Sequence, residues 1–433
     1  MVERPEYLRQ DIMSLTDRPF TSLLLRKGLY TFNERLITTK SIQVIGIEDD
    51  VDIDTGPGLH ISRLPTGSFT VDFEPEQMIK THFENVNFVS GDQFTVHKNC
   101  IATFYKCNIG CVNPFKCRQA FQERLSLFGT VSFGQTGCSG IAVCNGGTAY
   151  IDACLLNRCG GGGVLSDGKG SFIEIKNCTV QNMKQMGIEA RNEGTVKISK
   201  NTISQNQTHG IAIGSNGYAY IEDNIIQGNG SEGIWCGGIS DSHESENLNE
   251  TGASRAVLID NDIGQNGLSG ISCDGCFVEI KGNRIFYNNF WGMMVKLRSS
   301  AYILNNEIFD NKCGGIRIGH NYTASVIIDG NTIRDHTGPG VYTVNSIERV
   351  FNKIKDWSDS LVGNGEILGY SRPPVITSTN VLRNNGKGTQ HPSEVVRLIE
   401  ACSFCRHVSH NLKSCSKYKK ATYCSNDCQT KHW

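Results

Sequence analysis

Four cysteines near the carboxyl terminus have the spacing of a metal site. Cys402 and Cys405 form a C-x2-C pair, and Cys424 and Cys428 form a C-x3-C pair farther along the chain. Two thiolate pairs of this kind can close a tetrahedral site around a zinc ion. A segment this short lacks an apolar core, so we expect the bound metal to supply its folding free energy.

The same segment resembles a MYND-type zinc finger, through the run from Tyr423 to Trp433 that reads YCSNDCQTKHW. The resemblance implies a first zinc site made by the two cysteine pairs and a second site in which Cys415 is a ligand. Further ligands of that second site would lie beyond Trp433, so we expect one Zn2+ per chain. MYND fingers bind short proline-containing peptides, and the resemblance therefore implies a protein partner.

Acid–base chemistry has weaker support in the sequence. Asp223 and Asp260 hold the same place in two successive copies of a repeat, and two adjacent carboxylates can bind a cation or act as acid and base. Acidic residues beside an asparagine turn are more often solvated turn formers. Cys273 and Cys276 form another C-x2-C pair without a second pair nearby, which indicates a structural role. We therefore expect no catalytic residue and no enzymatic activity.

Four further side chains predict a binding surface. They come two residues after the glycine of successive repeat copies, and they are Trp235, Met294, Arg317 and Tyr342. These residue types are enriched in protein-binding hot spots, although they can equally stack on sugar rings. Packing beneath the insertion at 237–254 is the remaining alternative, because loops often cover apolar patches.

The central part of the chain consists of a repeat of about 23 residues, which must position the aspartates and the surface row described above. Its clearest copy contains Ile198, Asn201, Ile203 and Gly210. The Asn201 position recurs as Cys154, Cys178, Asn201, Asn224, Asn261, Asn283, Asn306 and Asn331. A unit this short cannot bury its own apolar face, so successive units must stack.

Apolar and small or polar residues alternate within each copy, as they do in β-strands that have one buried face. Three such strands joined by asparagine and glycine turns make one coil of a parallel β-helix, in which Asn side chains can form a ladder. We expect Ile198, Ile221, Leu258, Ile280 and Ile303 to stack in one buried line. The repeat resembles that of right-handed parallel β-helix proteins of the pectin-lyase-like type, whose best-known members act on acidic polysaccharides.

Composition narrows the class of protein. The chain has 42 Lys and Arg against 43 Asp and Glu, a formal charge of −1, which gives no electrostatic footprint for nucleic acid or anionic lipid. No stretch approaches the ~20 apolar residues of a membrane span. The polar amino terminus carries no signal-peptide core, which favours a cytoplasmic or nuclear location and reduced thiols.

The sequence thus predicts an all-β protein with three parts. A right-handed parallel β-helix spans 20–385, a linker and short helix span 386–401, and a MYND-type finger spans 402–433. The expected function is that of a non-enzymatic intracellular adaptor that binds zinc and uses the β-helix and the finger for protein partners. The alternative is a carbohydrate-binding or polysaccharide-active β-helix protein.

Overall fold

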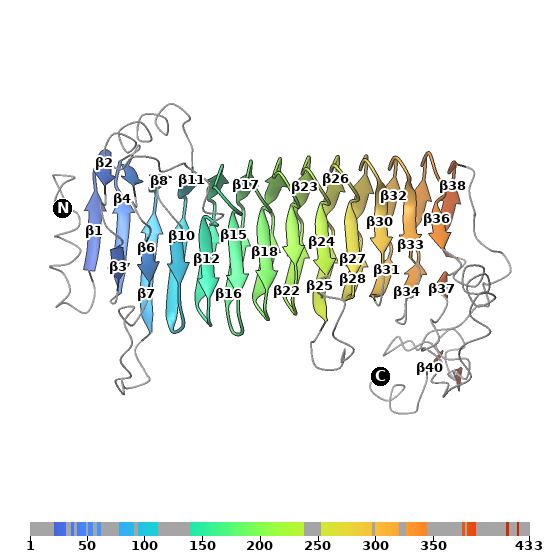
Figure 1. Cartoon of the computed structure of the whole chain (residues 1–433), viewed down its shortest axis with the longest axis horizontal. Helices are drawn as coiled ribbons and strands as arrows, with labels where there is room; N and C mark the ends of the chain where they lie inside the picture. The colour runs from blue at the N-terminus through green and yellow to red at the C-terminus, as the bar shows by residue number, and fades with distance from the viewer. Residues whose placement is uncertain are drawn as a thin grey trace, which may run out of the picture.

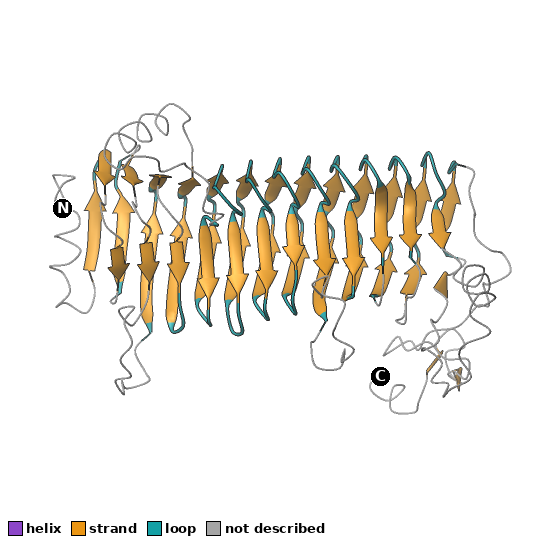
Figure 2. Cartoon of the chain, in the orientation of Figure 1, coloured by secondary structure: helices purple, strands orange, loops and turns teal. Residues whose placement is uncertain are grey.

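Stacked short strands form a long rod in the computed structural model of the chain (Figure 1). The structure describes residues 21–31, 36–38, 41–48, 51–54, 59–61, 78–90, 94–110, 139–237, 253–296, 299–319, 326–343, 375–376, 379–386, 413–414 and 422–423. Regular structure in these residues is β throughout, without a helix (Figure 2). The all-β parallel β-helix predicted from the repeat is therefore confirmed.

Three parallel sheets run along the rod, and each coil contributes one strand to each sheet. Sheet A consists of β1 (Thr21–Leu25), β4 (Ile42–Gly46), β7 (Ile79–Glu84), β10 (Cys100–Tyr105), β13 (Thr148–Asp152), β16 (Phe172–Lys176), β19 (Thr195–Ser199), β22 (Tyr218–Glu222), β25 (Ser254–Ile259), β28 (Cys276–Lys281), β31 (Ser300–Leu304), β34 (Val326–Asp329) and β37 (Val375–Ile376).

Sheet B consists of β2 (Gly28–Thr31), β5 (Val51–Asp54), β8 (Asn87–Ser90), β11 (Asn108–Gly110), β14 (Leu155–Asn157), β17 (Thr179–Gln181), β20 (Thr202–Ser204), β23 (Ile225–Gln227), β26 (Asp262–Gly264), β29 (Arg284–Phe286), β32 (Glu307–Phe309), β35 (Thr332–Arg334) and β38 (Val381–Arg383).

Sheet C consists of β3 (Leu36–Thr38), β6 (Leu59–Ile61), β9 (Phe94–Val96), β12 (Ile141–Cys144), β15 (Val164–Asp167), β18 (Ile188–Arg191), β21 (Ile211–Ile213), β24 (Ile234–Gly237), β27 (Ile271–Asp274), β30 (Trp291–Val295), β33 (Gly314–Ile318) and β36 (Val341–Thr343). Apart from these sheets, β39 (Lys413–Ser414) pairs antiparallel with β40 (Thr422–Tyr423).

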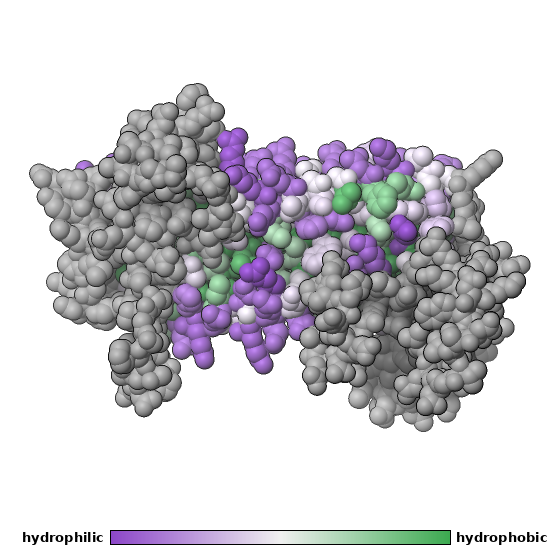
Figure 3. Space-filling view, in the orientation of Figure 1, coloured by the Kyte–Doolittle hydropathy of each residue, from purple (hydrophilic) through white to green (hydrophobic). Residues whose placement is uncertain are grey.

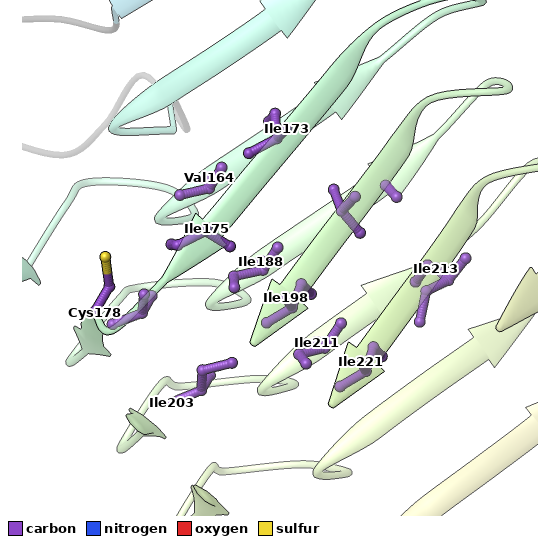
Figure 4. Packing of buried hydrophobic residues seen from close by; sticks show 14 of the residues in the cluster. Val164, Ile173, Ile175, Cys178, Ile188, Ile198, Ile203, Ile211, Ile213 and Ile221 are labelled. Carbon is purple, nitrogen blue, oxygen red and sulfur yellow. The ribbon is translucent and has the colours of Figure 1, made fainter. Parts of the chain in front are cut away.

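The interior of the rod is a continuous apolar core. Strand alternation points every second side chain inward, where residues of the same register stack from coil to coil (Figure 4). The predicted buried line is confirmed: the strand registers join Ile198, Ile221, Leu258, Ile280 and Ile303, and all five are fully buried. Each strand is thus held by its neighbours along the rod rather than by its own coil.

An asparagine ladder closes the turn between sheets A and B. Asn224 shows the pattern, since its Oδ1 accepts from the backbone N–H and the Nδ2 of Asn201 at 2.9 and 3.0 Å, while its own Nδ2 donates to the Ile198 carbonyl. In the earlier coils the Sγ of Cys154 and of Cys178 takes the acceptor position. The turn residue before each ladder position, such as Lys200 or Asp223, has a left-handed φ.

A second ladder lies at the turn between sheets B and C. It contains Asn206, Asn229, Asn266, Asn288, Asn311, His336 and Asn385. His336 is the exception in this series: its Nδ1 accepts the Asn311 backbone N–H at 3.0 Å, and its buried Nε2 has no hydrogen-bond partner among the described residues. Burial lowers the pKa of His336 to about 4.

Candidate functional site

The predicted surface row exists on the outer face of sheet C. Register pairs join Trp235 through Ser272 to Met294, and then Met294 to Arg317 and Arg317 to Tyr342. The four predicted side chains are half-buried, and they follow one line along the rod because parallel strands keep their register. The structure therefore brings these residues together on one face.

Trp235 lies flat against the sheet. A Cβ atom added at Gly237 would overlap Cζ2 of the indole, and one added at Gly214 would lie 3.5 Å from its Cζ3. These two glycines leave the outer surface of two adjacent coils free of side chains, so the indole rests on backbone. The imidazole of His209 stacks beside it, with ring centroids 5.8 Å apart and an interplanar angle of 20°. The result is a flat aromatic platform.

A cluster of two carboxylates and a guanidinium group lies two to three coils from this platform, on the amino-terminal side. Arg191 donates from Nε and Nη2 to Oδ2 of Asp167 at 2.9 and 2.8 Å, and its Nη1 lies 3.5 Å from Oε1 of Glu189. Asp167 and Arg191 are register partners on β15 and β18, and Glu189 is two residues before Arg191 on the same outer face. Asn192 donates to the other oxygen of Asp167, which fixes the carboxylate.

A histidine–carboxylate pair occupies the turn before sheet C. Nδ1 of His209 lies 3.1 Å from Oε2 of Glu232, and both side chains are largely buried. Each of the two residues directly precedes the repeat glycine of its coil, so the turn geometry places them one above the other. The pair lies next to the indole because the same imidazole stacks on Trp235.

The buried Glu232 and the half-buried Glu189 have opposite pKa shifts. Burial raises the pKa of Glu189, and the nearby Arg191 offsets that shift only in part. Burial also opposes ionisation of Glu232, but the hydrogen bond and charge of His209 hold the pKa of Glu232 below its usual value. Carboxyl groups whose environments move their pKa values apart are suited to act as an acid and a base.

A second ion pair adjoins the platform on the carboxyl-terminal side. Asp274 is the register partner of Gly237, and its Oδ2 lies 3.9 Å from Nζ of Lys296 on the next coil. Along the rod, Arg191 and Asp167 thus lie two and three coils before Trp235, and Asp274 and Lys296 lie one and two coils after it. Hydrophilic residues and smaller hydrophobic areas lie side by side on the described surface in Figure 3.

The other carboxylates considered from the sequence lie elsewhere. Asp223 and Asp260 are exposed residues with left-handed φ in the turn between sheets A and B. Cys273 and Cys276 are buried free thiols inside the rod. Their positions fit turn and core residues, as the sequence indicated.

Sequence reasoning missed most of the acid–base cluster. Glu189 is two residues after the repeat glycine Gly187, but neither it nor its neighbours Asp167 and Arg191 were predicted as site residues. The signal was available, since these two residues fall two positions farther along the same strands. His209 and Glu232 share the position just before the glycine, where a shared register also predicts a contact.

The predicted zinc ligands lie outside the described residues. These are Cys402, Cys405, Cys415, Cys424 and Cys428. Within the described part of the chain, no three His, Cys, Asp or Glu side chains are grouped in a way that could hold a metal ion. A search of the same residues found no helix long and apolar enough to cross a membrane.

Solved structures with a similar fold include two modules of mannuronan C-5 epimerases. The A-module of the Azotobacter vinelandii mannuronan C-5 epimerase AlgE4 is 11% identical, covers 88% of this chain and 91% of its own, and has a TM-score of 0.51. The AlgE6 A-module of the same organism is 13% identical over 89% and 90%, with a TM-score of 0.49. No curated protein matches the sequence.

A more distant similarity involves a glycoside hydrolase. The catalytic unit of a GH87 α-1,3-glucanase from Streptomyces thermodiastaticus is 9% identical, over 89% of this chain and 66% of its own, with a TM-score of 0.41. At these identities the comparisons establish a shared β-helix fold.

Two predictions from the sequence are wrong in the light of these comparisons. The non-enzymatic adaptor and the absence of enzymatic activity are contradicted, because the similar solved structure with a TM-score of 0.51 is a module of an epimerase. The error arose from searching for aspartate clusters and acid–base motifs at the turns, whereas the titratable side chains gather on the outer face of sheet C. The alternative, a carbohydrate-binding or polysaccharide-active protein, is the better supported of the two.

The family itself is shown by a sequence match. A family model described as the right handed beta helix region matches residues 130–251 and 171–356, which together span more than half of the 433 residues. The match ends before residue 402 and so gives no support for a MYND finger. The three stacked parallel sheets agree with the family description. The chain therefore belongs to the family of right-handed β-helix proteins.

Proposed function

We propose that this protein binds a polysaccharide along the outer face of sheet C and performs acid–base chemistry on it. The observation that carries the proposal is that His209 and Glu232 lie beside the flat indole of Trp235, with Glu189 two coils away in the same surface row. An aromatic ring that is backed by glycine and flanked by polar side chains is suited to stack on a sugar ring.

The shape of the site favours a polymer. Coils follow one another at the inter-strand spacing, on the order of 5 Å, so equivalent side chains form straight rows along the rod. A linear chain of sugar rings laid along such a row meets a new set of side chains at each coil. The fold shared with a mannuronan epimerase module is consistent with this use of a β-helix.

Within the site, the two carboxyl groups have different roles. Glu189 is the proton donor, because burial keeps its carboxyl protonated to higher pH than an ordinary glutamate. Glu232 stays ionised beside His209, so its carboxylate is the proton acceptor, and the imidazole holds it in place. Arg191 holds Asp167 and Glu189 in place by its hydrogen bonds.

Replacing Glu189 with glutamine should lower turnover of a cleaved or epimerised polysaccharide by about a hundredfold, because the amide cannot donate the proton. The measurement is product formation over a panel of soluble polysaccharides, followed by reducing-end assay and by NMR of the polymer. Glu174→Gln is the matched control: Glu174 lies on β16, on the sheet A surface of the same coil, paired with Lys197 at 2.9 Å.

The control should retain full turnover. Equal losses in both variants would mean that the effect comes from the fold of that coil. Full activity in Glu189→Gln would remove Glu189 from the chemistry, and failure to bind any polysaccharide would contradict the proposal as a whole.

We also propose that the segment 402–433 binds zinc through Cys402, Cys405, Cys424 and Cys428. Support comes from the spacing of the two cysteine pairs and from the antiparallel pairing of β39 with β40. β39 ends directly before Cys415, and β40 ends directly before Cys424. In zinc modules of this size the metal supplies the folding free energy.

Elemental analysis of the full chain should give about one zinc ion per molecule, because four thiolates complete one site. Cys424→Ser should lose the metal, whereas Cys313→Ser, which removes a partly exposed thiol of the rod, should retain it. A metal content near zero in the unmodified chain contradicts the zinc proposal. A content near two indicates a second site that includes Cys415.

The protein-partner assignment of Trp235, Met294, Arg317 and Tyr342 stays a prediction, as do the proline-containing peptide partner and the cytoplasmic or nuclear location. Under the polysaccharide proposal, the same row of residues binds a glycan and not a protein. The glutamate variant separates the two, since a loss of polysaccharide turnover in Glu189→Gln is expected only if a glycan occupies the row.

A further inference from the structure

The charges around Trp235 restrict the kind of polysaccharide that can lie on sheet C. Within two coils of Trp235, the carboxyl groups on sheet C and in the turn before it include Glu189, Glu232 and Asp274. Over the same two coils on either side, the cations described on the outer face of sheet C are Arg191 and Lys296, and each is already paired; Arg317 lies three coils away.

Both cations beside the platform are already engaged. Arg191 donates two hydrogen bonds to Asp167, and its Nη1 lies 3.5 Å from Glu189. Nζ of Lys296 lies 3.9 Å from Asp274. A polymer that carries a carboxylate on each sugar would have to displace these pairs. It would also place its own charge near carboxylates that the guanidinium and ammonium then no longer neutralise.

We propose that the ring bound on Trp235 belongs to a neutral glycan, and that the flanking ion pairs bind its hydroxyl groups. This inference rests on the proposed function and names its substrate class. A hydroxyl group can accept from a paired guanidinium and donate to a paired carboxylate at the same time, without breaking either ion pair. The apolar face of the ring then covers the indole, whose other face is closed by Gly214 and Gly237.

The indole must also lie flat for this binding mode. A methyl group at position 237 overlaps the Trp235 ring, so Gly237→Ala keeps the tryptophan but lifts it from the sheet. Loss of glycan binding in that variant would show that the orientation of the ring matters, and not only its apolar area.

Binding is best measured by calorimetry and affinity electrophoresis with the full chain. The probes are three soluble neutral polymers, an α-glucan, a β-glucan and a galactomannan, and two anionic ones, alginate and polygalacturonate. At least one neutral polymer should bind, and Trp235→Ala should weaken that binding by about tenfold or more. Gly237→Ala should have a similar effect.

Tyr218→Ala is the matched control, because Tyr218 is an exposed aromatic residue of β22, on sheet A of the same coil as Trp235. It should leave binding unchanged. Asp274→Asn frees Lys296 from its carboxylate partner and should increase binding of the anionic polymers relative to the unmodified chain. Thermal unfolding of each variant establishes whether the rod is intact.

Different outcomes overturn different statements. Binding of alginate or polygalacturonate in preference to every neutral polymer, with loss in Trp235→Ala, contradicts the neutral-glycan inference and leaves polysaccharide binding on sheet C in place. Neutral-glycan binding that survives both Trp235→Ala and Gly237→Ala contradicts the platform. Binding of no polymer at all contradicts the proposed function itself.

Discussion

Replacing Ile280 with aspartate should lower the free energy of unfolding by roughly 3–5 kcal/mol. Ile280 is fully buried on β28, with Leu258 and Ile303 as its register partners on the adjacent coils. The new carboxyl group would lie inside the stack, where its neighbours in register are aliphatic and offer no charge or side-chain hydrogen bond. Urea unfolding followed by circular dichroism measures the loss.

Lys281→Asp is the control for this change, because position 281 is adjacent on the same strand and its side chain is exposed. It introduces the same carboxylate at the surface and should lower the free energy of unfolding by less than about 1 kcal/mol. A small loss in Ile280→Asp, or equal losses in the two variants, would contradict the assignment of Ile280 to the core of the rod.

The sequence was sufficient to predict how this rod is stacked. The spacing of the Asn201 column alone sets the register of sheet A, because a ladder of amides fixes each coil on its neighbour. The register survives the longer step between Asn224 and Asn261, since Asn224 makes the same two bonds to Asn261 that Asn201 makes to Asn224. Alternation within each strand then decides which side chains are buried.

The site was harder to predict because it depends on side-chain contacts between coils. Arg191 and Asp167 are 24 residues apart and each looks like an ordinary exposed strand residue. The flat position of Trp235 depends on two glycines, Gly214 and Gly237, that a search for functional side chains overlooks. The pKa directions of Glu189 and Glu232 follow from burial and from His209, neither of which a single position reveals.

In the described coils, the second ladder runs from Asn206 to Asn385, and His336 is its only residue that is not an asparagine. Its folded pKa of about 4 lies below the ordinary value of 6.5, so the unfolded chain binds more protons between those two pH values. The stability that the neutral imidazole contributes is therefore complete above pH 6.5 and is lost as the pH falls toward 4. Protonation at Nδ1 would also remove the acceptor for the Asn311 backbone N–H.

Replacing His336 with asparagine should remove this pH dependence. The amide can continue the ladder, with Oδ1 as acceptor for Asn311, and it carries no titratable proton. Between pH 7 and pH 4 the unmodified chain should lose about 3 kcal/mol more unfolding free energy than the variant does.

Denaturant unfolding at several pH values compares the two proteins under identical conditions, so the titration of all other groups cancels. His82→Asn is the control, because His82 is a partly exposed histidine of β7 outside both ladders. This variant should lose as much unfolding free energy between pH 7 and pH 4 as the unmodified chain does. Parallel curves for the unmodified chain and His336→Asn would show that the imidazole is solvated in the folded rod, and that the second ladder does not exclude its charged form.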